Sequence, residues 1–510
     1  MALRPLPNVA TPSAQARADA LALADQARLR RYADYLDFYN GRQWVKPRPG
    51  RTNLVANYAR VIVDKGVSYL LGQGVNFAVP TGDREALTLP LSQGEREQRA
   101  AAAEELLYRV YEENELEAVD IQGAINGAVL GDTVFKVFWE ERASGIRHQA
   151  TGDAGTRGHG DTGPSITSTT STLGRQGDRA TGRRGEEGRI RVVNIDPFTF
   201  FPRWAEDDPS TLLAVSLVYR LSAEEAALRY GDGETRGRGD AAIEKLSPRL
   251  RVSPSPCPVV EEWTDTEFVL TVADREVVRA ANPYGFVPFV HIPNARPANE
   301  FWGISDLKDV VPLNRELNER MSDVADIIRF HADPPVIFKG VMEHSNLSVG
   351  PGTVWDLPEG ADVQLLEWRG QTPAIQEHIE RVMRALHDVT ETPKTAFGDS
   401  GRLLSGVALE TELQPLIQKT LRKRAWWSAG LRRRNRYILR IAELKGLGSF
   451  APYRSKVIWP PLLPADSEVE VRNNVALVSA GLRSRRTAMD RLGEESPEEE
   501  MRLIDEERST

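Results

Sequence analysis

Apolar side chains recur every three or four residues in two stretches of the second half of the chain. This spacing predicts two amphipathic helices at residues 305–331 and 373–389. Between them, glycine and proline bound three short strand candidates at residues 334–338, 353–355 and 363–366. So small a strand module cannot bury a sufficient core, and the apolar stripe of each helix needs another surface. The pattern therefore predicts a projecting stalk that neighbouring subunits complete.

Periodic patterns elsewhere predict an α+β fold that is predominantly α. Predicted helices cover residues 13–39, 53–71, 95–113, 116–130, 222–230 and 405–447, and short helices follow from residue 467. Predicted strands cover residues 134–139, 190–195, 259–263, 267–272 and 276–278. Pro415 predicts a kink or break near Glu412 in the longest helix. Pro312 leaves open that the first stalk helix starts at that proline, after a separate turn.

Residues 143–188 differ in composition from the rest of the chain. They are dense in Gly, Ser, Thr and Arg and nearly lack large apolar side chains. Such a segment cannot bury enough surface to offset the entropy of ordering it. Because strand patterns precede and follow it, we expect a mobile surface loop inserted in a β-hairpin. A basic arm that contacts nucleic acid or a capsid is the alternative.

The overall composition is globular, with 41% hydrophobic and 27% charged residues among 510, enough for roughly two to four structural units. The net charge of −8 argues against a tight grip on nucleic acid, but not against nucleic acid that slides past. The single cysteine, Cys257, excludes an intramolecular disulfide and a multi-cysteine metal site. Neither a signal peptide nor an apolar run long enough for a membrane span is found, so we expect a soluble protein made in a cytoplasm.

Motifs for catalysis are missing from the sequence. It contains no phosphate-binding G-x-x-x-x-G-K-[ST] loop and no G-x-S-x-G motif, and its histidines are scattered. Basic residues intersperse with one run of carboxylates, formed by Asp306, Asp309, Glu316, Glu319, Asp323 and Asp326. We favour a solvated or subunit-bridging face for this run, with a two-metal nuclease site as the alternative. We predict no catalytic residue, no metal and no cofactor.

A second charged cluster is basic. It comprises Lys419, Arg422, Lys423 and Arg424, then Arg432, Arg433, Arg434 and Arg436, with Trp426 and Trp427 between the two groups. Basic residues interleaved with aromatic ones can form a nucleic-acid surface. On one helix, however, these positions spread over several faces. We therefore favour packed, inter-subunit salt bridges and keep DNA contact as the alternative.

Short motifs stand in a fixed order along the chain. They are YNGRQW at 39–44, NLVANYARVIVD at 53–64, WGISDL at 302–307, ADPPV at 332–336, TETP at 390–393, SGVAL at 405–409, WPPLLP at 459–464 and GLRSRRT at 481–487. Their order resembles that of the portal proteins of tailed bacteriophages, of the siphophage type. Members of this family form dodecameric rings with wing, stem, clip and crown regions, through which double-stranded DNA enters and leaves the capsid.

The resemblance implies a division of the chain into regions. These are the wing at 1–303, the first stem helix at 304–332, the clip at 333–368, the second stem helix at 369–391, the tunnel loop at 392–404, a long kinked helix returning to the wing at 405–466, and the crown and C-terminal tail at 467–510. DNA is then expected at the tunnel loop, on Lys394, Thr395, Phe397, Gly398, Ser400, Gly401 and Arg402. Partner docking is expected at the clip, on Lys339, Glu343, His344, Trp355 and Glu359.

The resemblance also implies a homo-oligomeric ring, expected to hold twelve copies, without catalysis or cofactor. Its expected place is one capsid vertex of the virion, after assembly in the host cytoplasm. Expected partners are double-stranded DNA in the channel, the large terminase, a head-completion or adaptor protein, and the major capsid and scaffold proteins, with no membrane. A metal-dependent nuclease and a protein-only adaptor or scaffold ring are the alternative hypotheses.

Overall fold

The secondary structure is mixed and predominantly helical. The computed structural model describes residues 13–80, 93–141, 188–222, 225–226, 256–273, 275–332, 336–340, 359–365, 372–398, 406–463, 467–492 and 497–509. About 52% of these residues are helical and 21% lie in strands, and the described strands form no closed barrel. The predicted loop at 143–188, except its last residue, and most of the predicted helix at 222–230 lie outside the described residues.

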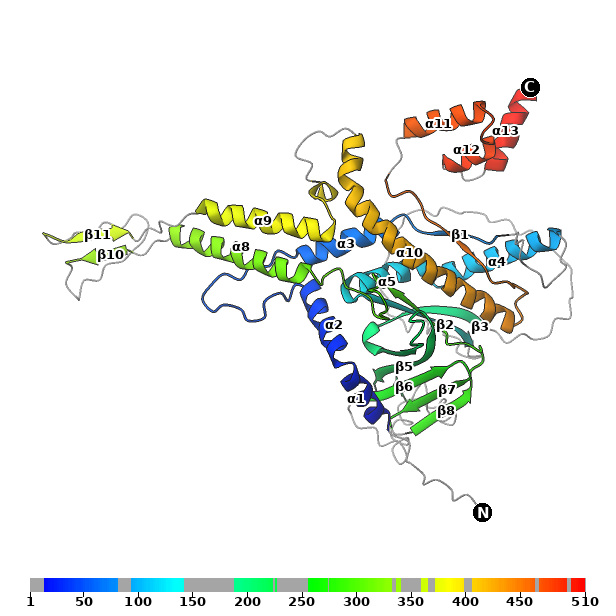
Figure 1. Cartoon of the computed structure of the whole chain (residues 1–510), viewed down its shortest axis with the longest axis horizontal. Coiled ribbons are helices and arrows are strands. Elements are labelled where there is room, and N and C mark those ends of the chain that lie inside the picture. Colours follow the sequence, from blue (N-terminus) through cyan, green and yellow to red (C-terminus); the bar gives the residue numbers. More distant parts are fainter. Residues whose placement is uncertain are drawn as a thin grey trace, which may run out of the picture.

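Two antiparallel sheets form the body of the molecule (Figure 1). The smaller has the order β3-β2-β9 and consists of β2 (Asp132–Glu141), β3 (Gly188–Ile195) and β9 (Phe289–Pro293). The larger has the order β4-β5-β6-β7-β8 and consists of β4 (Phe200–Trp204), β5 (Leu212–Leu221), β6 (Cys257–Thr264), β7 (Glu267–Val272) and β8 (Arg275–Ala281). Strands β2 and β3 pair from Val134 opposite Ile195 to Glu141 opposite Gly188, which confirms the predicted hairpin pairing.

The N-terminal half supplies five helices within the described residues. These are α1 (Ala14–Ala24), α2 (Gln26–Tyr39), α3 (Tyr58–Leu71), α4 (Gln93–Glu113) and α5 (Leu116–Leu130). The prediction of one helix over 13–39 is wrong, because Asp25 leaves the helical conformation between α1 and α2. The helix predicted from residue 53 begins later, at Tyr58, because the side chain of Asn57 caps it by accepting the N–H of Arg60.

The long helix α10 (Gly406–Leu444) crosses the smaller sheet at very short range. A Cβ atom at Gly430 would lie 2.3 Å from Ile292 Cδ1 of β9, so only glycine allows this approach. Helix α5 approaches the same sheet through Gly123, where a Cβ would lie 2.9 Å from the ring of Phe135. The ring centroids of Trp427 and Phe135 are 6.2 Å apart, and the largest hydrophobic core lies around them.

A buried ion pair joins α10 to α5 inside this core. The guanidinium group of Arg434 is fully buried and pairs with both carboxylate oxygens of Asp120. Its Nη2 also donates to the hydroxyl of Tyr111 at 2.8 Å. Breaking such a pair leaves an uncompensated charge in a dry interior, so the pair specifies how α10 sits on α5.

A helical hairpin projects from the body (Figure 1). It consists of α8 (Val310–Ala332) and α9 (Thr372–Thr390), with the antiparallel pair β10 (Val336–Lys339) and β11 (Asp362–Leu365) at its far end. Both predicted helices are thus confirmed. Turns precede α8, and Pro312 is the third residue of the helix. Backbone N–H groups in the first turn have no acceptor within the helix, so a proline at this position costs no hydrogen bond. The strand predicted at 353–355 lies outside the described residues.

Helix α10 continues through Pro415, and its first part runs at an angle to the rest (Figure 1). The proline therefore kinks the helix without breaking it, as expected for a lost backbone donor within a packed helix. Downstream, β12 (Lys456–Ile458) pairs with β1 (Asn76–Ala78). Three short helices end the chain and lie apart from the body in Figure 1: α11 (Ser467–Ser479), α12 (Arg485–Arg491) and α13 (Pro497–Ser509).

Four polar side chains, spaced four residues apart on α8, bind the backbone of residues 52–59, which leads into the first turn of α3. Their oxygens accept hydrogen bonds of 2.9 Å in the pairs Asn314 with the N–H of Ala59, Asn318 with Ala56, Ser322 with Leu54 and Asp326 with Thr52. Alternate N–H groups of an extended segment point to the same side, which suits three of these four bonds. The hairpin is therefore fastened to the body through side chains.

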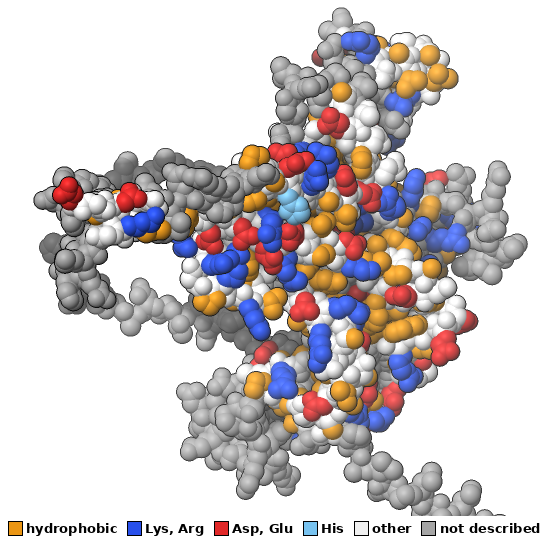
Figure 2. Space-filling view, turned by 60° about the vertical axis from the view of Figure 1, so that its left-hand side comes forward, with side chains coloured by type: hydrophobic (Ala, Val, Ile, Leu, Met, Phe, Trp, Pro, Cys, Tyr) orange, Lys and Arg blue, Asp and Glu red, His pale blue; other side chains and the backbone are white. Residues whose placement is uncertain are grey.

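Charges of both signs are interspersed over the visible described face, without one large single-sign area (Figure 2). This agrees with the modest net charge of −8. Such a surface does not bind polyanions strongly by charge alone.

Replacing Asn318 by Ala should weaken the attachment of residues 52–59 to α8. The variant loses the acceptor for the N–H of Ala56 and the donor to Gln43 Oε1, now 2.6 Å away. We expect the free energy of unfolding in urea to fall by about 1–3 kcal/mol, since buried polar groups lose their partners. Amide hydrogen exchange at Ala56 should accelerate. Asn473→Ala, at an exposed position of α11, is the matched control. Wild-type stability and exchange in Asn318→Ala would contradict the account.

Candidate functional site

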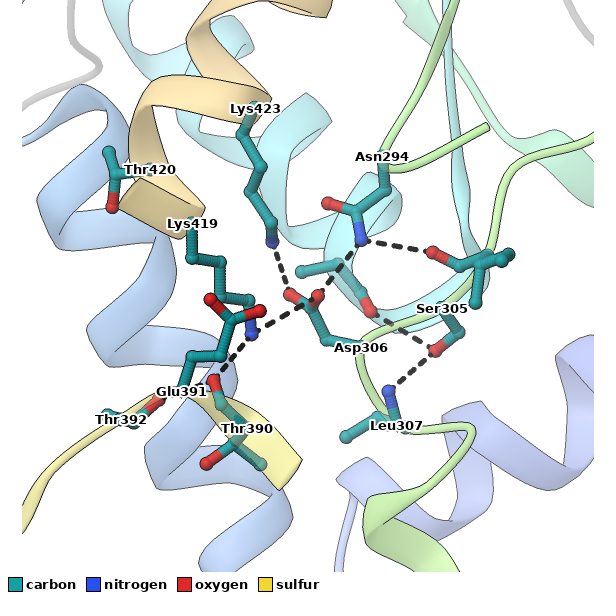
Figure 3. Close-up of polar contacts among 12 residues, drawn as sticks. Asn294, Ser305, Asp306, Leu307, Thr390, Glu391, Thr392, Lys419, Thr420 and Lys423 are labelled. Carbon is teal, nitrogen blue, oxygen red and sulfur yellow. Dashed lines mark hydrogen bonds and ion pairs between the residues drawn. The ribbon is translucent and has the colours of Figure 1, made fainter. Parts of the chain in front are cut away.

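The base of the projecting hairpin is organised around one carboxylate, that of Asp306, whose side chain is only 9% exposed (Figure 3). Asp306 lies just before α8, and its backbone N–H donates to the carbonyl of Ala128 at 2.9 Å. The ammonium group of Lys423 on α10 donates to Oδ2, and that of Lys419 lies 3.6 Å from Oδ1. Asn294 Nδ2 completes the set, donating to Oδ1 at 3.1 Å. The carboxylate of Asp306 thus ties the start of α8 to α10 and to the segment after β9, and its backbone N–H ties the same residue to α5.

The electrostatics of this group favour its charged form. Burial acts to raise the pKa of Asp306, but the charges of Lys419 and Lys423, with hydrogen bonds from Lys423 and Asn294, outweigh it. The pKa of Asp306 is therefore well below its ordinary value. A carboxylate paired with two cations is a structural clamp, because neither a free proton nor an open coordination position is left for chemistry.

Lys419 also contacts the turn that follows α9. Lys419 Nζ donates to the carbonyl of Thr390 at 3.0 Å, and Arg422 Nη2 lies 2.6 Å from both carboxylate oxygens of Glu391. Glu391 has a φ of 54°, an unusual value for a residue other than glycine. Within this turn His387 Nδ1 lies 2.8 Å from the carbonyl oxygen of Thr392. The segment that follows α9 therefore leaves the hairpin from a fixed point.

Four of the seven residues predicted to face DNA lie in described residues, directly after this turn. Lys394 is exposed and makes no ion pair within the described part of the chain. Thr395 Oγ1 is buried, and Phe397 packs on the core, with its ring 5.6 Å from that of His387. Gly398 has a φ of 87° and open space around its Cα, which suits a turn. The other three, Ser400, Gly401 and Arg402, lie outside the described residues.

The sequence suggested that the basic cluster on α10 forms salt bridges between subunits or contacts DNA. In the structure, its first four members contact groups of the same chain. Lys423 is buried against Asp306, and Lys419 contacts Asp306 and Thr390, all within one chain. Arg424 is also buried, donates to the carbonyl of Pro460 at 2.7 Å and lies 4.8 Å from the ring of Trp459. Arg422 is the exposed member, and it pairs with Glu391. In this structure these cations brace the chain internally.

Two of the five predicted docking residues are described. Lys339 on β10 donates to Gln364 Oε1 of β11 at 2.8 Å, and Glu359 is exposed just before β11. Glu343, His344 and Trp355 lie outside the described residues. The described pair therefore sits at the tip of the hairpin, the part farthest from the body (Figure 1).

Five of the six carboxylates considered for a nuclease site pair with cations. Asp323 pairs with Arg48 at 2.7 Å and with Arg320 at 2.8 Å, and Glu316 pairs with Arg320 at 3.0 Å. Within the described ranges, no three His, Cys, Asp or Glu side chains are grouped so that they could hold a metal ion. The geometry gives the nuclease hypothesis no support.

Comparison with known proteins identifies the family. The family model described as phage portal protein, SPP1 Gp6-like, matches residues 20–510. The chain belongs to this portal family. No individually curated protein matches it. The sequence-based recognition of a siphophage-type portal protein is thereby confirmed.

Membership in the family establishes the role of this portal chain. It is a bacteriophage head–tail connector at a capsid vertex and serves in DNA packaging. Portal proteins are ring oligomers with capsid and terminase partners, and the family is structural rather than enzymatic. Among the helices that the structure describes, none is both long and apolar enough to cross a membrane.

Sequence reasoning missed the centre of this site. In the sequence, Asp306 is only one of six carboxylates in a charged run, although it stands inside the WGISDL motif. Its partner Asn294 is 12 residues away, and Lys423 is 117 residues away on α10, where the neighbouring Lys419 also lies. No local pattern in the sequence therefore brings them together. The signal that could have pointed to Asp306 is the pair of lysines at i and i+4 on α10, because two cations on a packed face of a helix need a counter-charge opposite.

Replacing Asp306 by Asn should leave the ammonium groups of Lys419 and Lys423 without a buried counter-charge. We expect the free energy of unfolding at pH 7 to fall by about 3–5 kcal/mol, measured by urea denaturation. Asp309→Asn, at an exposed carboxylate three residues away, is the control and should change stability little.

The pH dependence gives an independent check of the same pair. Because the pKa of Asp306 is lowered by folding, its contribution is complete above the unfolded value of about 3.9 and is lost as the pH falls toward the folded value. The stability gap between wild type and Asp306→Asn should therefore shrink between about pH 5 and pH 2. A gap that stays constant or widens in acid would show that the carboxylate is not charged in the folded protein.

Proposed function

We propose that copies of this chain form a ring in which the α8–α9 hairpins stand side by side around a channel for double-stranded DNA. The observation that carries this proposal is the projecting hairpin itself (Figure 1). Ile328 on α8 is 63% exposed and Val389 on α9 is 49% exposed in the single chain. Hairpins of neighbouring copies offer apolar surface that covers such side chains, and a closed ring leaves no hairpin without neighbours.

The regions of the chain then take their places in this ring. The stem consists of residues 304–332 and 369–391, the clip of 333–368, the wing of 1–303 with 405–466, and the crown of 467–510. Helix α8 has 23 residues and spans about 35 Å, a length suited to a channel through a capsid vertex. The separate position of α11–α13 agrees with a crown that is distinct from the wing.

The segment 392–404 is proposed as the tunnel loop that faces DNA. It starts from the turn that Lys419 and Arg422 hold, so its first residues have a defined position. The ammonium group of Lys394 is exposed and makes no ion pair within the described residues, which leaves it available for phosphate. One such cation per copy, repeated around a ring, supplies weak contacts in many places without a strong binding site.

The tip of the hairpin is proposed as the docking surface for the large terminase during packaging and for a head-completion protein afterwards. Lys339 and Glu359 at this tip present charges of both signs on short β-structure. The wing is proposed to face the major capsid and scaffold proteins. These assignments rest on the position of each region relative to the hairpin.

Replacing Lys394 by Glu should impair DNA packaging and leave ring formation intact. A carboxylate repeated around the channel repels phosphate, so we expect packaged DNA to fall at least about tenfold in a packaging assay. Lys456→Glu, at an exposed lysine of β12, is the matched control. Deleting residues 398–402 should also spare the ring and impair packaging or DNA retention. Normal DNA-filled heads from both loop variants would reject the loop assignment and would suit a protein-only adaptor ring.

A further inference from the structure

A cavity of about 700 Å³ opens on the body beside strand β1. Its apolar wall comes from β1, the end of α3, the last turns of α4 and the start of α5, through Leu71, Phe77, Tyr108, Tyr111, Leu116 and Ile121. Tyr108 is 44% exposed and Ile121 is 37% exposed, so the apolar wall reaches the surface. A cavity of this size accepts one or two large apolar side chains of a partner.

The wall of this cavity is formed in advance and held by internal bonds. The ring centroids of Phe77 and Tyr111 are 4.7 Å apart, and the hydroxyl of Tyr108 donates to the carbonyl of Phe77 at 3.1 Å. The hydroxyl of Tyr111 donates to Asn435 Oδ1 at 2.8 Å and accepts a bond from Arg434. Because these polar groups are already satisfied, the wall offers apolar surface without an unpaired donor.

Three carboxylates at the junction of α4 and α5 line the cavity beside the apolar wall. Glu112, Glu115 and Glu117 line the cavity and are exposed, and none makes an ion pair within the described part of the chain. This differs from the many carboxylates elsewhere that pair with arginine or lysine, such as Asp120 and Asp306. An apolar cavity with an unpaired acidic rim is complementary to an apolar side chain flanked by cations.

The chain itself carries such a segment in the turn between α11 and α12. Leu482 is 77% exposed there, and Arg483, Arg485 and Arg486 follow it directly. Arg483 already donates to Asn474, but Arg485 is exposed and makes no ion pair within the described residues. Val45 is equally exposed, but the neighbouring Arg42 already pairs with Asp37. The turn at Leu482 is therefore the better match to the acidic rim.

We propose that Leu482 of one copy inserts into this cavity of a second copy, with Arg485 placed over the rim of Glu112, Glu115 and Glu117. A second copy is required because, within one chain, Leu482 stays in solvent and α11–α13 lie apart from the body (Figure 1). The proposal rests on the ring arrangement proposed above and adds a specific contact to it. The C-terminal helices of each subunit then fasten the body of another.

Disulfide trapping between two variants tests the contact directly. One protein carries Leu482→Cys and the other Ile121→Cys, and the natural Cys257 is buried in both. After mixing, assembly and mild oxidation, we expect a disulfide-linked dimer that reduction abolishes. Leu503→Cys, at an exposed leucine of α13, is the control for Leu482→Cys and should give no dimer with Ile121→Cys.

The outcomes separate this proposal from the proposed ring. Rings seen by electron microscopy without the disulfide-linked dimer would overturn the contact and leave the ring proposal standing. A disulfide formed inside one chain that carries both cysteines, with no dimer in the mixture, would also overturn it. Absence of rings under every condition would overturn both proposals.

A charge exchange tests the rim independently of any cysteine. Arg485→Glu should weaken subunit association about tenfold, measured as the protein concentration at which rings form. Glu112→Arg, in the last turn of α4, where a cation is well tolerated, should restore association when combined with Arg485→Glu. Failure of the double variant to recover, with both single variants folded, would show that these two charges do not meet.

Discussion

The buried carboxylate of Asp306 is the interaction on which the arrangement of hairpin, long helix and body depends. Its bonds to Lys423 and Asn294, and its proximity to Lys419, join segments from three parts of the chain. Lys419 extends this connection to the turn after α9. Because a buried charge needs its partners in place, the start of α8, the end of α9 and the middle of α10 hold one mutual orientation. If each copy contributes one hairpin to the wall of a channel, the hairpin must keep a fixed orientation relative to the body.

The sequence predicted those elements whose signal is local. Helices α5 and α9 match their apolar periodicity closely, and Pro312 marked the first turn of α8. Strands β4, β5 and β9 escaped prediction because they are short or continuous apolar runs without alternation. The single helix expected over 13–39 failed at Asp25, where no glycine or proline signals an interruption. Expectations for the tip depend in part on residues outside the described ranges.

Contacts between residues far apart in the sequence explain the features that the sequence did not predict. The basic cluster on α10 suggested DNA or a neighbouring subunit, but Asp306, Glu391 and Asp120 of the same chain pair with it. The polar side chains of α8 that bind residues 52–59 could not be recognised from the sequence either. Their partners are backbone groups more than 250 residues away. Near the hairpin base, Lys394 is exposed and makes no ion pair within the described residues, which fits a conduit that touches DNA only weakly.

The central claim is that hairpins of neighbouring copies stand together around a channel. Electron microscopy of the purified protein, with reconstruction of single particles, tests it most directly. We expect closed rings with a through-channel wide enough for B-form DNA, with α8 and α9 beside it and the segment after α9 facing it. Particles that remain single copies in every condition, or rings whose hairpins point away from the axis, would contradict the account.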